Sequence, residues 1–531
     1  METERPEGRE DRWAPPLAGR HQTMLPFDDP QTVRQALRSA RLELEHVMAG
    51  IEALERLYEQ NLEAHLDELA HHFLHALPAG DVDKAIDYAT RAGEHACAVF
   101  AYEDAADYYG RGLHVLERKP APNEQQRCEL LLALGSTYSK AGETAKSRSS
   151  LLAAVEIARK TRAPELLARA ALGLAPGWGE VGGVDQALID HLEEALEVLP
   201  RQDGALRSRV LGRLASALYW SDSRKRRMAL SQEAVEMARR LGDKDTLSRA
   251  LNARHWALLG QEHVEERLEA ASEIVRLATE TGDLSLAARG HHFRLIDLLG
   301  LGDIAGADAE IDVYARLAQE IRQPLYLWHV PLFGAMRAIM EGRFLEAERL
   351  AEEALAVGQR GFDQTAAQFY GVQLFALRKE QGRVAELEPA IKAFVDQYPV
   401  IPAWRCGLAF IYAEAGREAE ARAEFERLAG DLASVPEDAL WITVLSLLSE
   451  VCAFLGDVDR AGVLYQVLAP YAGRAVVVAP ACACFGAVSQ YLGTLATTMR
   501  RWDDAAHHLF RRRARAERTD GRATVRCPHS A

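Results

Sequence analysis

The chain has 531 residues, which is too many for one ordinary hydrophobic core, so it forms either several domains or one elongated repeat array. Its net charge of −15 argues against direct nucleic-acid binding by the main body. The seven cysteines are scattered and show no paired metal-ligand spacing, which favours buried free thiols in a reducing cytoplasm.

The first segment of the chain, residues 1–30, is rich in proline, glycine and charge and has no apolar core like that of a secretory signal. We predict that it is a disordered tail. From Thr32 to Leu57, apolar residues recur at steps of three, four and seven, and this spacing predicts one long helix.

After Pro78, helical stretches alternate with short glycine, aspartate or proline breaks, and one short phrase keeps returning. The phrase is a glycine, four residues, and then usually a small residue. It occurs as Gly80–Ala85, Gly142–Ser147, Gly302–Ala307, Gly342–Ala347, Gly382–Leu387, Gly416–Ala421 and Gly456–Ala461. From Gly302 onward the steps are 40, 40, 34 and 40 residues, which is typical of stacked helical hairpins.

The phrase has a physical explanation. Glycine readily adopts the left-handed backbone conformation that ends one helix, whereas a residue with a Cβ adopts it at a cost in free energy. The small residue five positions later is expected where two helices cross, because a larger side chain would push their axes beyond about 8–10 Å.

The most apolar stretch, from Ala475 to Val488, is shorter than the roughly 20 residues that a membrane helix needs, so we expect no membrane association. Within it, Val476–Val478 is the one strand-like fragment, and it is too short to predict a sheet. We therefore predict an all-α fold, a right-handed α-solenoid of antiparallel helical hairpins with about 34–43 residues per repeat.

Four segments are expected along the chain. They are the tail 1–30, N-terminal helical repeats over 31–175, a continuing solenoid over 176–508, and a basic disordered tail over 509–531. The hairpin rhythm is weakest near Pro176-Gly-Trp-Gly179, where the superhelix could break.

Several stretches carry a family resemblance. They are Glu68–Phe73, Ala101–Ala106, Leu134-Gly135-x-x-Tyr138, Gly407–Tyr412 and Asp438–Trp441. With them the chain resembles the tetratricopeptide repeat family over roughly residues 46 to 508. More specifically, it is similar to the C-terminal helical module of bacterial signal-transduction ATPase regulators. In that family the module often follows a nucleotide cyclase domain or precedes a LuxR-type DNA-binding domain.

The resemblance implies a cytoplasmic, non-catalytic scaffold or sensor module that binds a protein or peptide in bacterial signalling or transcriptional regulation. One alternative is an arm that senses a small-molecule inducer. No Gly-x-x-x-x-Gly-Lys-Ser/Thr phosphate loop occurs, and the Arg-rich end after Phe510 departs from the repeat pattern. A truncated remnant of such a regulator is therefore a third alternative.

No catalytic or metal motif stands out. His71 and His75 share a helical face, but His-Glu-x-x-His and Gly-x-Ser-x-Gly are both absent. We expect no enzyme activity, no cofactor and no metal. The basic stretch Arg224–Arg227 could contact phosphate or an acidic peptide, although an exposed helix start is the simpler interpretation.

Partner binding by a solenoid concentrates on the concave surface formed by the first helix of each hairpin. Placing each hairpin by its glycine puts five candidate contact residues there: Arg254, Arg289, His292, His329 and Glu450. Because several of them are cationic or titratable, they would suit an acidic peptide or an anionic metabolite.

Overall fold

The computed structural model describes residues 30–59, 61–77, 80–174, 182–221, 223–260, 262–360, 363–429 and 437–509. Both predicted tails, apart from Pro30 and Leu509, and the expected break at Pro176–Gly179 lie outside these residues. The chain divides into two compact units between Tyr88 and Ala89, inside helix α3 (Val82–Ala98). Among the described helices, none is long and apolar enough to cross a membrane.

Unit 1 begins with the predicted long helix, α1 (Pro30–Leu57), and continues through η1 (Leu62–His65) and α2 (Leu66–His75) into the start of α3. Its packing centres on Phe73, which is fully buried and stacks on Tyr88 with ring centroids 4.9 Å apart. The Glu55 carboxylate accepts hydrogen bonds from Tyr88 Oη at 2.7 Å and from Lys84 Nζ at 2.5 Å. These bonds tie α1 to α3.

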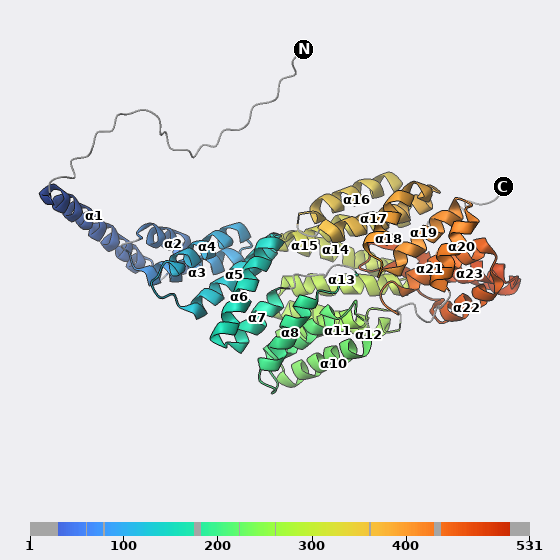
Figure 1. Cartoon of the computed structure of the whole chain (residues 1–531), viewed down its shortest axis with the longest axis horizontal. Coiled ribbons are helices and arrows are strands. Elements are labelled where there is room, and N and C mark those ends of the chain that lie inside the picture. The colour runs from blue at the N-terminus through green and yellow to red at the C-terminus, as the bar shows by residue number, and fades with distance from the viewer. Residues whose placement is uncertain are drawn as a thin grey trace, which may run out of the picture. The chain divides into compact units, whose positions relative to one another are not determined.

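Unit 2 is a succession of helices joined by short connections (Figure 1). In chain order they are α4 (Tyr102–Glu117), α5 (Glu124–Ala141), α6 (Thr144–Thr161), α7 (Pro164–Gly173), α8 (Gln186–Val198), α9 (Ala205–Ala217), α10 (Arg224–Leu241), α11 (Lys244–Ala257), α12 (Val264–Thr281), α13 (Leu284–Leu301), α14 (Ile304–Ile321), α15 (Pro324–Met340), α16 (Phe344–Gly358), α17 (Asp363–Glu380), η2 (Val384–Leu387), α18 (Glu388–Gln397), α19 (Pro402–Glu414), α20 (Glu418–Ala429), α21 (Trp441–Leu455), α22 (Val458–Leu468), η4 (Ala469–Tyr471) and α23 (Val488–Thr498).

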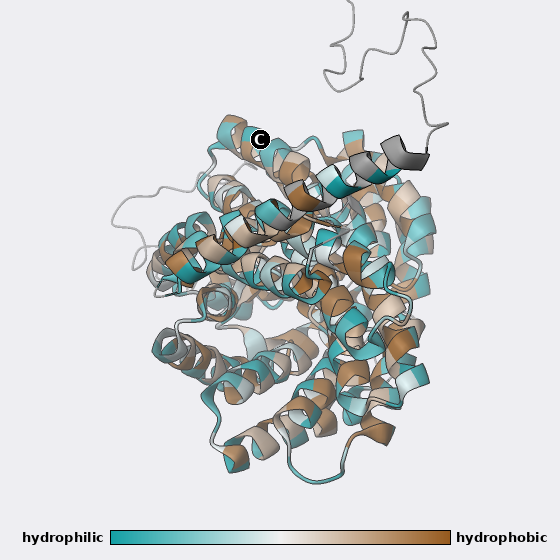
Figure 2. Cartoon of the chain, turned by 90° about the vertical axis from the view of Figure 1, so that its left-hand side faces the viewer, coloured by the Kyte–Doolittle hydropathy of each residue, from teal (hydrophilic) through white to brown (hydrophobic). Residues whose placement is uncertain are grey.

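The helix contacts of unit 2 define a solenoid. Most helices pack against the next one in sequence, and α5, α7, α9, α11 and α13 also pack in turn against each other, as do α19, α21 and α23. The odd-numbered helices are therefore the first helices of successive hairpins. Hydrophobic and hydrophilic residues alternate around individual helices (Figure 2), as expected where each helix buries one stripe. The predicted all-α solenoid of helical hairpins is confirmed.

The turn phrase works as predicted at most of its positions. Six of its seven glycines have positive φ, from 66° at Gly456 to 86° at Gly142, and Gly80 is the exception. Five of the residues that end the phrase are alanines, and Ala85, Ala307, Ala347, Ala421 and Ala461 are all completely buried. At Gly382 the phrase ends in Leu387 instead, and a short 3-10 turn precedes α18, which has Pro389 in its first turn. Small residues therefore mark the close helix crossings.

The path of unit 2 turns back on itself. Gln323, just before α15, donates a hydrogen bond from Nε2 to Tyr102 Oη at 2.9 Å, across 221 positions of sequence. Further on, the Ala439 N–H donates to Tyr219 Oη at 2.8 Å, across 220 positions. Successive turns of the superhelix are thus joined directly.

The structure corrects the expectation that Val476–Val478 forms no sheet. Strand β1 (Ala475–Val478) pairs antiparallel with β2 (Ala483–Ala487), and all four residues of β1 are buried. β1 packs against α13 and α21, and β2 packs against α15 and α17. The apolar run makes a hairpin because the first helices supply an apolar surface to cover it, which no local pattern could show.

The closeness of the first helices gives a testable prediction. A Cβ added at Gly212 in α9 would lie 2.9 Å from Ala253 Cβ in α11, and neither atom belongs to a flexible side chain. We expect Gly212→Ala to lower the free energy of unfolding by about 1–2 kcal/mol, because overpacking outweighs the gain in helix propensity. Urea denaturation measures the change. The matched control is Gly110→Ala in α4, where a Cβ meets nothing within 4 Å; if the two variants respond alike, the close crossing is wrong.

Candidate functional site

Four consecutive first helices carry an arginine at the same position of the repeat. Arg169 in α7, Arg209 in α9, Arg249 in α11 and Arg289 in α13 are spaced 40 residues apart, and His329 in α15 takes the next place. Because α7, α9, α11 and α13 contact one another in turn, equal phase puts these arginines on one continuous face. We call these four residues the arginine row.

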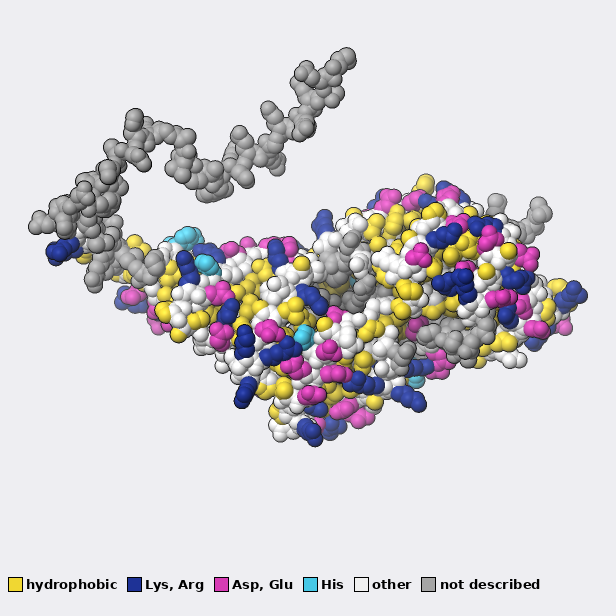
Figure 3. Space-filling view, in the orientation of Figure 1, with side chains coloured by type: hydrophobic (Ala, Val, Ile, Leu, Met, Phe, Trp, Pro, Cys, Tyr) yellow, Lys and Arg dark blue, Asp and Glu magenta, His cyan; other side chains and the backbone are white. Residues whose placement is uncertain are grey.

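Most of the row lacks a counter-ion. Arg249 pairs with Asp245 at 2.9 Å and with Asp283 at 3.1 Å. Among the described residues, Arg169, Arg209 and Arg289 form no salt bridge or side-chain hydrogen bond, and the neighbouring Arg213 forms none either. By contrast, basic and acidic side chains lie interspersed on the face shown in Figure 3. The row is thus a local excess of positive charge.

The surroundings disfavour the charge of Arg209 in the row and of the neighbouring Arg213. Burial lowers the pKa of Arg209, and the positive charges of Arg249 and Arg169 lower it further. Burial lowers the pKa of Arg213 to about 10, with Arg289 adding to the effect, and Arg213 Nε is buried without a hydrogen-bond partner. Each of the two guanidinium groups thus feels the positive charge of a row arginine, and an anionic ligand nearby would favour its charged form.

Three of the five candidate contact residues lie together at the end of the row. The rings of His292 and His329 are 5.0 Å apart, and the charge of Arg289 helps to lower the pKa of both. Burial is the largest cause, and it lowers the pKa of His329 to about 4. Both histidines are therefore neutral and enclosed within the chain at neutral pH.

The chain's own β-hairpin covers this end of the first-helix face. His292 Nε2 lies 2.8 Å from the carbonyl oxygen of Pro480, in the hairpin turn. Gln373 in α17 donates from Nε2 to the carbonyl oxygen of Cys482 at 3.0 Å and to that of Leu332 at 2.8 Å. Neither of these hairpin bonds involves an arginine of the row.

The other two candidate contact residues are engaged elsewhere. Arg254 donates to Glu266 at 3.0 Å and to Ser231 Oγ at 3.2 Å, so it bridges α11 to the second helices α12 and α10. Glu450 pairs with Lys379 at 3.0 Å, and burial raises the pKa of its carboxyl group. Partner contact by any of the five residues stays a prediction.

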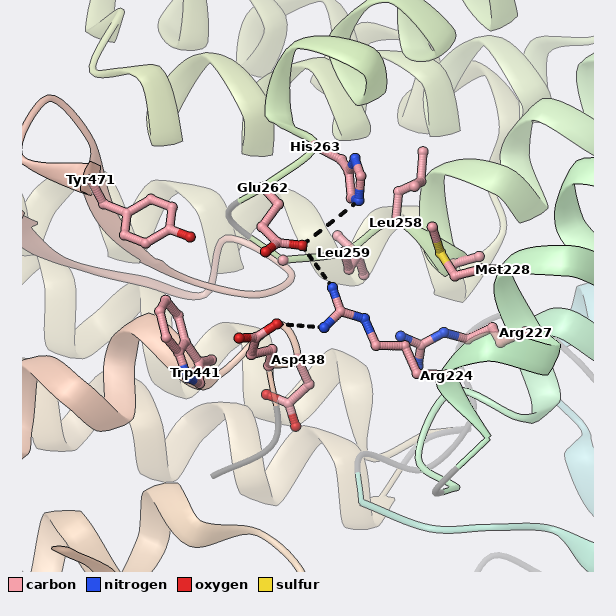
Figure 4. Close-up of a pocket in the computed structure, with 13 residues that line it drawn as sticks. Arg224, Arg227, Met228, Leu258, Leu259, Glu262, His263, Asp438, Trp441 and Tyr471 are labelled. Atoms are coloured by element: carbon pink, nitrogen blue, oxygen red, sulfur yellow. Dashed lines mark hydrogen bonds and ion pairs between the residues drawn. The ribbon is translucent and has the colours of Figure 1, made fainter. Parts of the chain in front are cut away.

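The basic stretch at the start of α10 forms part of a small cavity (Figure 4). Arg224 pairs with Glu437 at 2.5 Å and with Glu262 at 2.9 Å, which joins α10 to two other segments. The cavity measures about 10 Å³, roughly the space of one water molecule, so it cannot hold a larger ligand. The cavity lies where α10 meets the segment around Glu437, so it is part of the contact between turns of the superhelix.

Arg227 corrects the expectation of a wholly exposed helix start. Only 4% of its surface is exposed, whereas Arg224 and Arg226 are exposed as expected. Its guanidinium lies 4.4 Å from the centre of the Tyr219 ring and donates to the Tyr219 carbonyl oxygen at 2.7 Å. Neighbouring Asp438 is held in a poorly solvated place, and burial raises its pKa to about 6.

A buried charge cluster lies next to this contact between turns. Asp297 is completely buried and accepts from Arg267 Nη2 at 2.6 Å and from His255 Nε2 at 2.8 Å. Burial is the main cause that lowers the pKa of His255, against the raising effect of Asp297. His255 and Arg267 are also buried, which leaves a substrate no access and makes the cluster structural.

Neither thiols nor metal ligands form a reactive centre in the part of the chain that the structure describes. No group of three His, Cys, Asp or Glu residues could hold a metal ion there. Cys128, Cys406, Cys452 and Cys482 are buried free thiols, as predicted, while Cys97 and Cys484 are partly exposed. Burial raises the pKa of Cys482 to about 12, so this thiol is a poor nucleophile.

The raised pKa of Asp438 predicts a pH dependence. An aspartate whose folded pKa is near 6 binds more protons in the folded state than in the unfolded state between about pH 4 and pH 6. Its contribution to stability therefore falls as pH rises through that window. We expect Asp438→Asn to remove this fall and so gain stability relative to wild type from pH 4.5 to pH 7 in urea denaturation. The exposed Asp459→Asn in α22 is the control; a parallel response of both variants would contradict the assignment.

No family model and no curated protein matches the chain. Among solved structures, a Rap protein complexed with competence and sporulation factor shares 15% identity, covers 66% of this chain and 91% of its own, and has a TM-score of 0.38. Yeast Tom70 shares 12% identity over 82% of this chain and 92% of its own, with a TM-score of 0.36. A signal transduction ATPase with a tetratricopeptide repeat sensor from Pyrococcus horikoshii shares 14% over 62% of this chain and 49% of its own, with a TM-score of 0.34.

At these TM-scores the matches carry no argument about function. The assignment rests on the pairing of consecutive helices and on the contacts between successive first helices. By that criterion the chain is a solenoid of helical hairpins.

Proposed function

We propose that this protein is a non-catalytic scaffold or sensor that binds an acidic peptide segment of a partner protein along the arginine row. The observation that carries the proposal is the set of row arginines, Arg169, Arg209 and Arg289, without a carboxylate partner among the described residues of a chain whose net charge is −15. The chain has 78 acidic residues, and none of those described pairs with these arginines. This favours pairing with an anionic group of another molecule.

Arginine suits this task physically. Its planar guanidinium binds a carboxylate through two parallel hydrogen bonds and stays charged at all physiological pH values. Arg213 is partly buried, so its guanidinium has lost part of its water before any partner arrives, which reduces the cost of desolvation on binding. The row is therefore preorganised for anions.

The spacing of the row favours an extended peptide. Helices in direct contact lie about 8–10 Å apart, and an extended chain advances about 3.3 Å per residue. Acidic side chains about three residues apart would consequently meet successive arginines. Distant negative charges of the protein repel such a peptide little, because the Debye length is about 8 Å at physiological ionic strength.

The resemblance to the helical module of bacterial signal-transduction ATPase regulators supports a setting in signalling or transcriptional regulation. In that setting the partner would be a protein whose acidic segment reports the state of a regulator. The proposal involves no cofactor and no direct contact of the repeats with nucleic acid.

A peptide-binding assay tests the proposal. The probe is a fluorescein-labelled peptide of four Glu-Ser-Ala units, and its partner for comparison has the same composition with the four glutamates adjacent. We expect the spaced peptide to bind more tightly in fluorescence anisotropy and to weaken as salt is raised. Arg209→Ala and Arg289→Ala should each weaken it about tenfold, because each removes a charge-assisted hydrogen bond.

The matched control is Arg239→Ala in α10, an exposed arginine on a second helix that lies 3.6 Å from Glu273. It changes the net charge equally but lies off the row. Equal weakening by Arg209→Ala and Arg239→Ala would show that only overall charge matters and would reject the row. Displacement of the peptide by a single-stranded oligonucleotide at lower concentration would point to nucleic acid instead.

A further inference from the structure

The third place of the arginine row differs in charge from the places beside it. Arg249 Nη2 lies 2.9 Å from Asp245 Oδ1 in the same helix, α11, and 3.1 Å from Asp283 Oδ2 at the start of α13. One guanidinium and two carboxylates carry one positive and two negative charges, which leaves a net charge of −1 at this place.

The position four residues before the row arginine accounts for part of this difference. It holds Asp245 in α11 but Ala205 in α9 and Ser285 in α13. In α7 it holds Glu165, which forms no ion pair with Arg169 within the described ranges of the chain. The negative place in α11 thus lies between two helices that have no acid at this position.

The acidic residues that begin the helices account for the rest. Asp243 is the N-cap residue of α11, as Asp283 is of α13. The side chain of Asp243 accepts from the Thr246 N–H at 2.8 Å, and among the described residues it forms no ion pair with Arg209. Asp283 uses Oδ1 to cap its helix and Oδ2 to bind Arg249. Charge along the row therefore alternates, positive in α9, negative in α11 and positive in α13.

The charged groups of the third place are accessible. The side chains of Arg249, Asp245 and Asp283 are 37%, 42% and 25% exposed. Burial is the largest cause that lowers the pKa of Arg209, and the charge of Asp245 acts against it, so Asp245 lies close enough to influence the next arginine of the row. A ligand along the row would meet this negative charge together with the arginines on either side.

We propose that the peptide segment bound by the arginine row carries a basic residue between two acidic ones, in the pattern acidic-x-x-basic-x-x-acidic. The inference rests on the proposed peptide binding and names the charge pattern that the row selects. The basic side chain pairs with Asp245 and Asp283, and the flanking acidic side chains pair with Arg209 and Arg289. An acidic side chain in the middle would meet a net negative charge, so the row discriminates against uniformly acidic segments. The pattern is the same in both directions of the peptide.

Four competitor peptides of identical composition test the pattern. Each is acetylated and amidated and has four X-Ser-Ala units, with Lys as the first, second, third or fourth X and Glu as the other three. Each displaces the labelled peptide of four Glu-Ser-Ala units from the full chain, followed by fluorescence anisotropy. Lys has Glu on both sides only in the second and third peptides. We expect these two to bind about threefold more tightly than the first and fourth, which corresponds to one exposed ion pair.

A double variant tests the residues that read the basic side chain. Asp245→Asn/Asp283→Asn removes both negative charges and leaves Arg249, and asparagine still caps α13 because it is as good an N-cap as aspartate. We expect the order of the four peptides to reverse, since Lys between two Glu now faces a positive charge. The matched control is Asp459→Asn/Asp503→Asn, which neutralises two exposed acids outside the row and should keep the wild-type order.

Two results would overturn the inference while leaving the arginine row intact. One is that Lys between two Glu gives wild type no advantage, although Arg209→Ala still weakens the labelled peptide. The other is an advantage of that arrangement that the double variant at Asp245 and Asp283 retains. Failure of the labelled peptide to bind wild type at all would reject the proposed function, and this inference with it.

Discussion

Close approach of the helices at small residues is the constraint on which the rest of unit 2 depends. Ala307, Ala347, Ala421 and Ala461 are completely buried where neighbouring helices cross, and a left-handed glycine five positions earlier brings the chain around. Because the helix axes approach closely at each crossing, each hairpin stacks on the next at a nearly constant distance. With a constant step, residues 40 positions apart in sequence lie in a row on one face, as the four arginines do.

Much of this architecture follows from local chemistry. The glycine phrase predicts the hairpins because capping and crossing are decided within a few residues. Local sequence does not predict the β-hairpin, because Val476–Val478 forms a strand only when α13 and α21 cover it. Local sequence does not predict the contacts between turns either, since nothing near Tyr102 or Gln323 in the sequence indicates that they bond to each other.

The candidate site was partly visible in the sequence. Reasoning from the glycines identifies Arg289 but not Arg169, Arg209 or Arg249. The hairpins of Arg169 and Arg209 carry no copy of the glycine phrase, and on α11 the sequence pointed to Arg254 instead of Arg249. Their exact 40-residue spacing was a usable signal. No sequence pattern could show that Arg254 pairs with Glu266 or that the hairpin covers His292.

The contacts between turns change how unit 2 should unfold. An open repeat array behaves as a one-dimensional chain in which each repeat meets only its neighbours and can fray from either end. Here Gln323 bonds to Tyr102, Ala439 to Tyr219 and Pro480 to His292, each across more than 180 positions. Loss of one end therefore removes support from a repeat in the middle. Such cross-links favour cooperative loss of the whole unit over melting repeat by repeat.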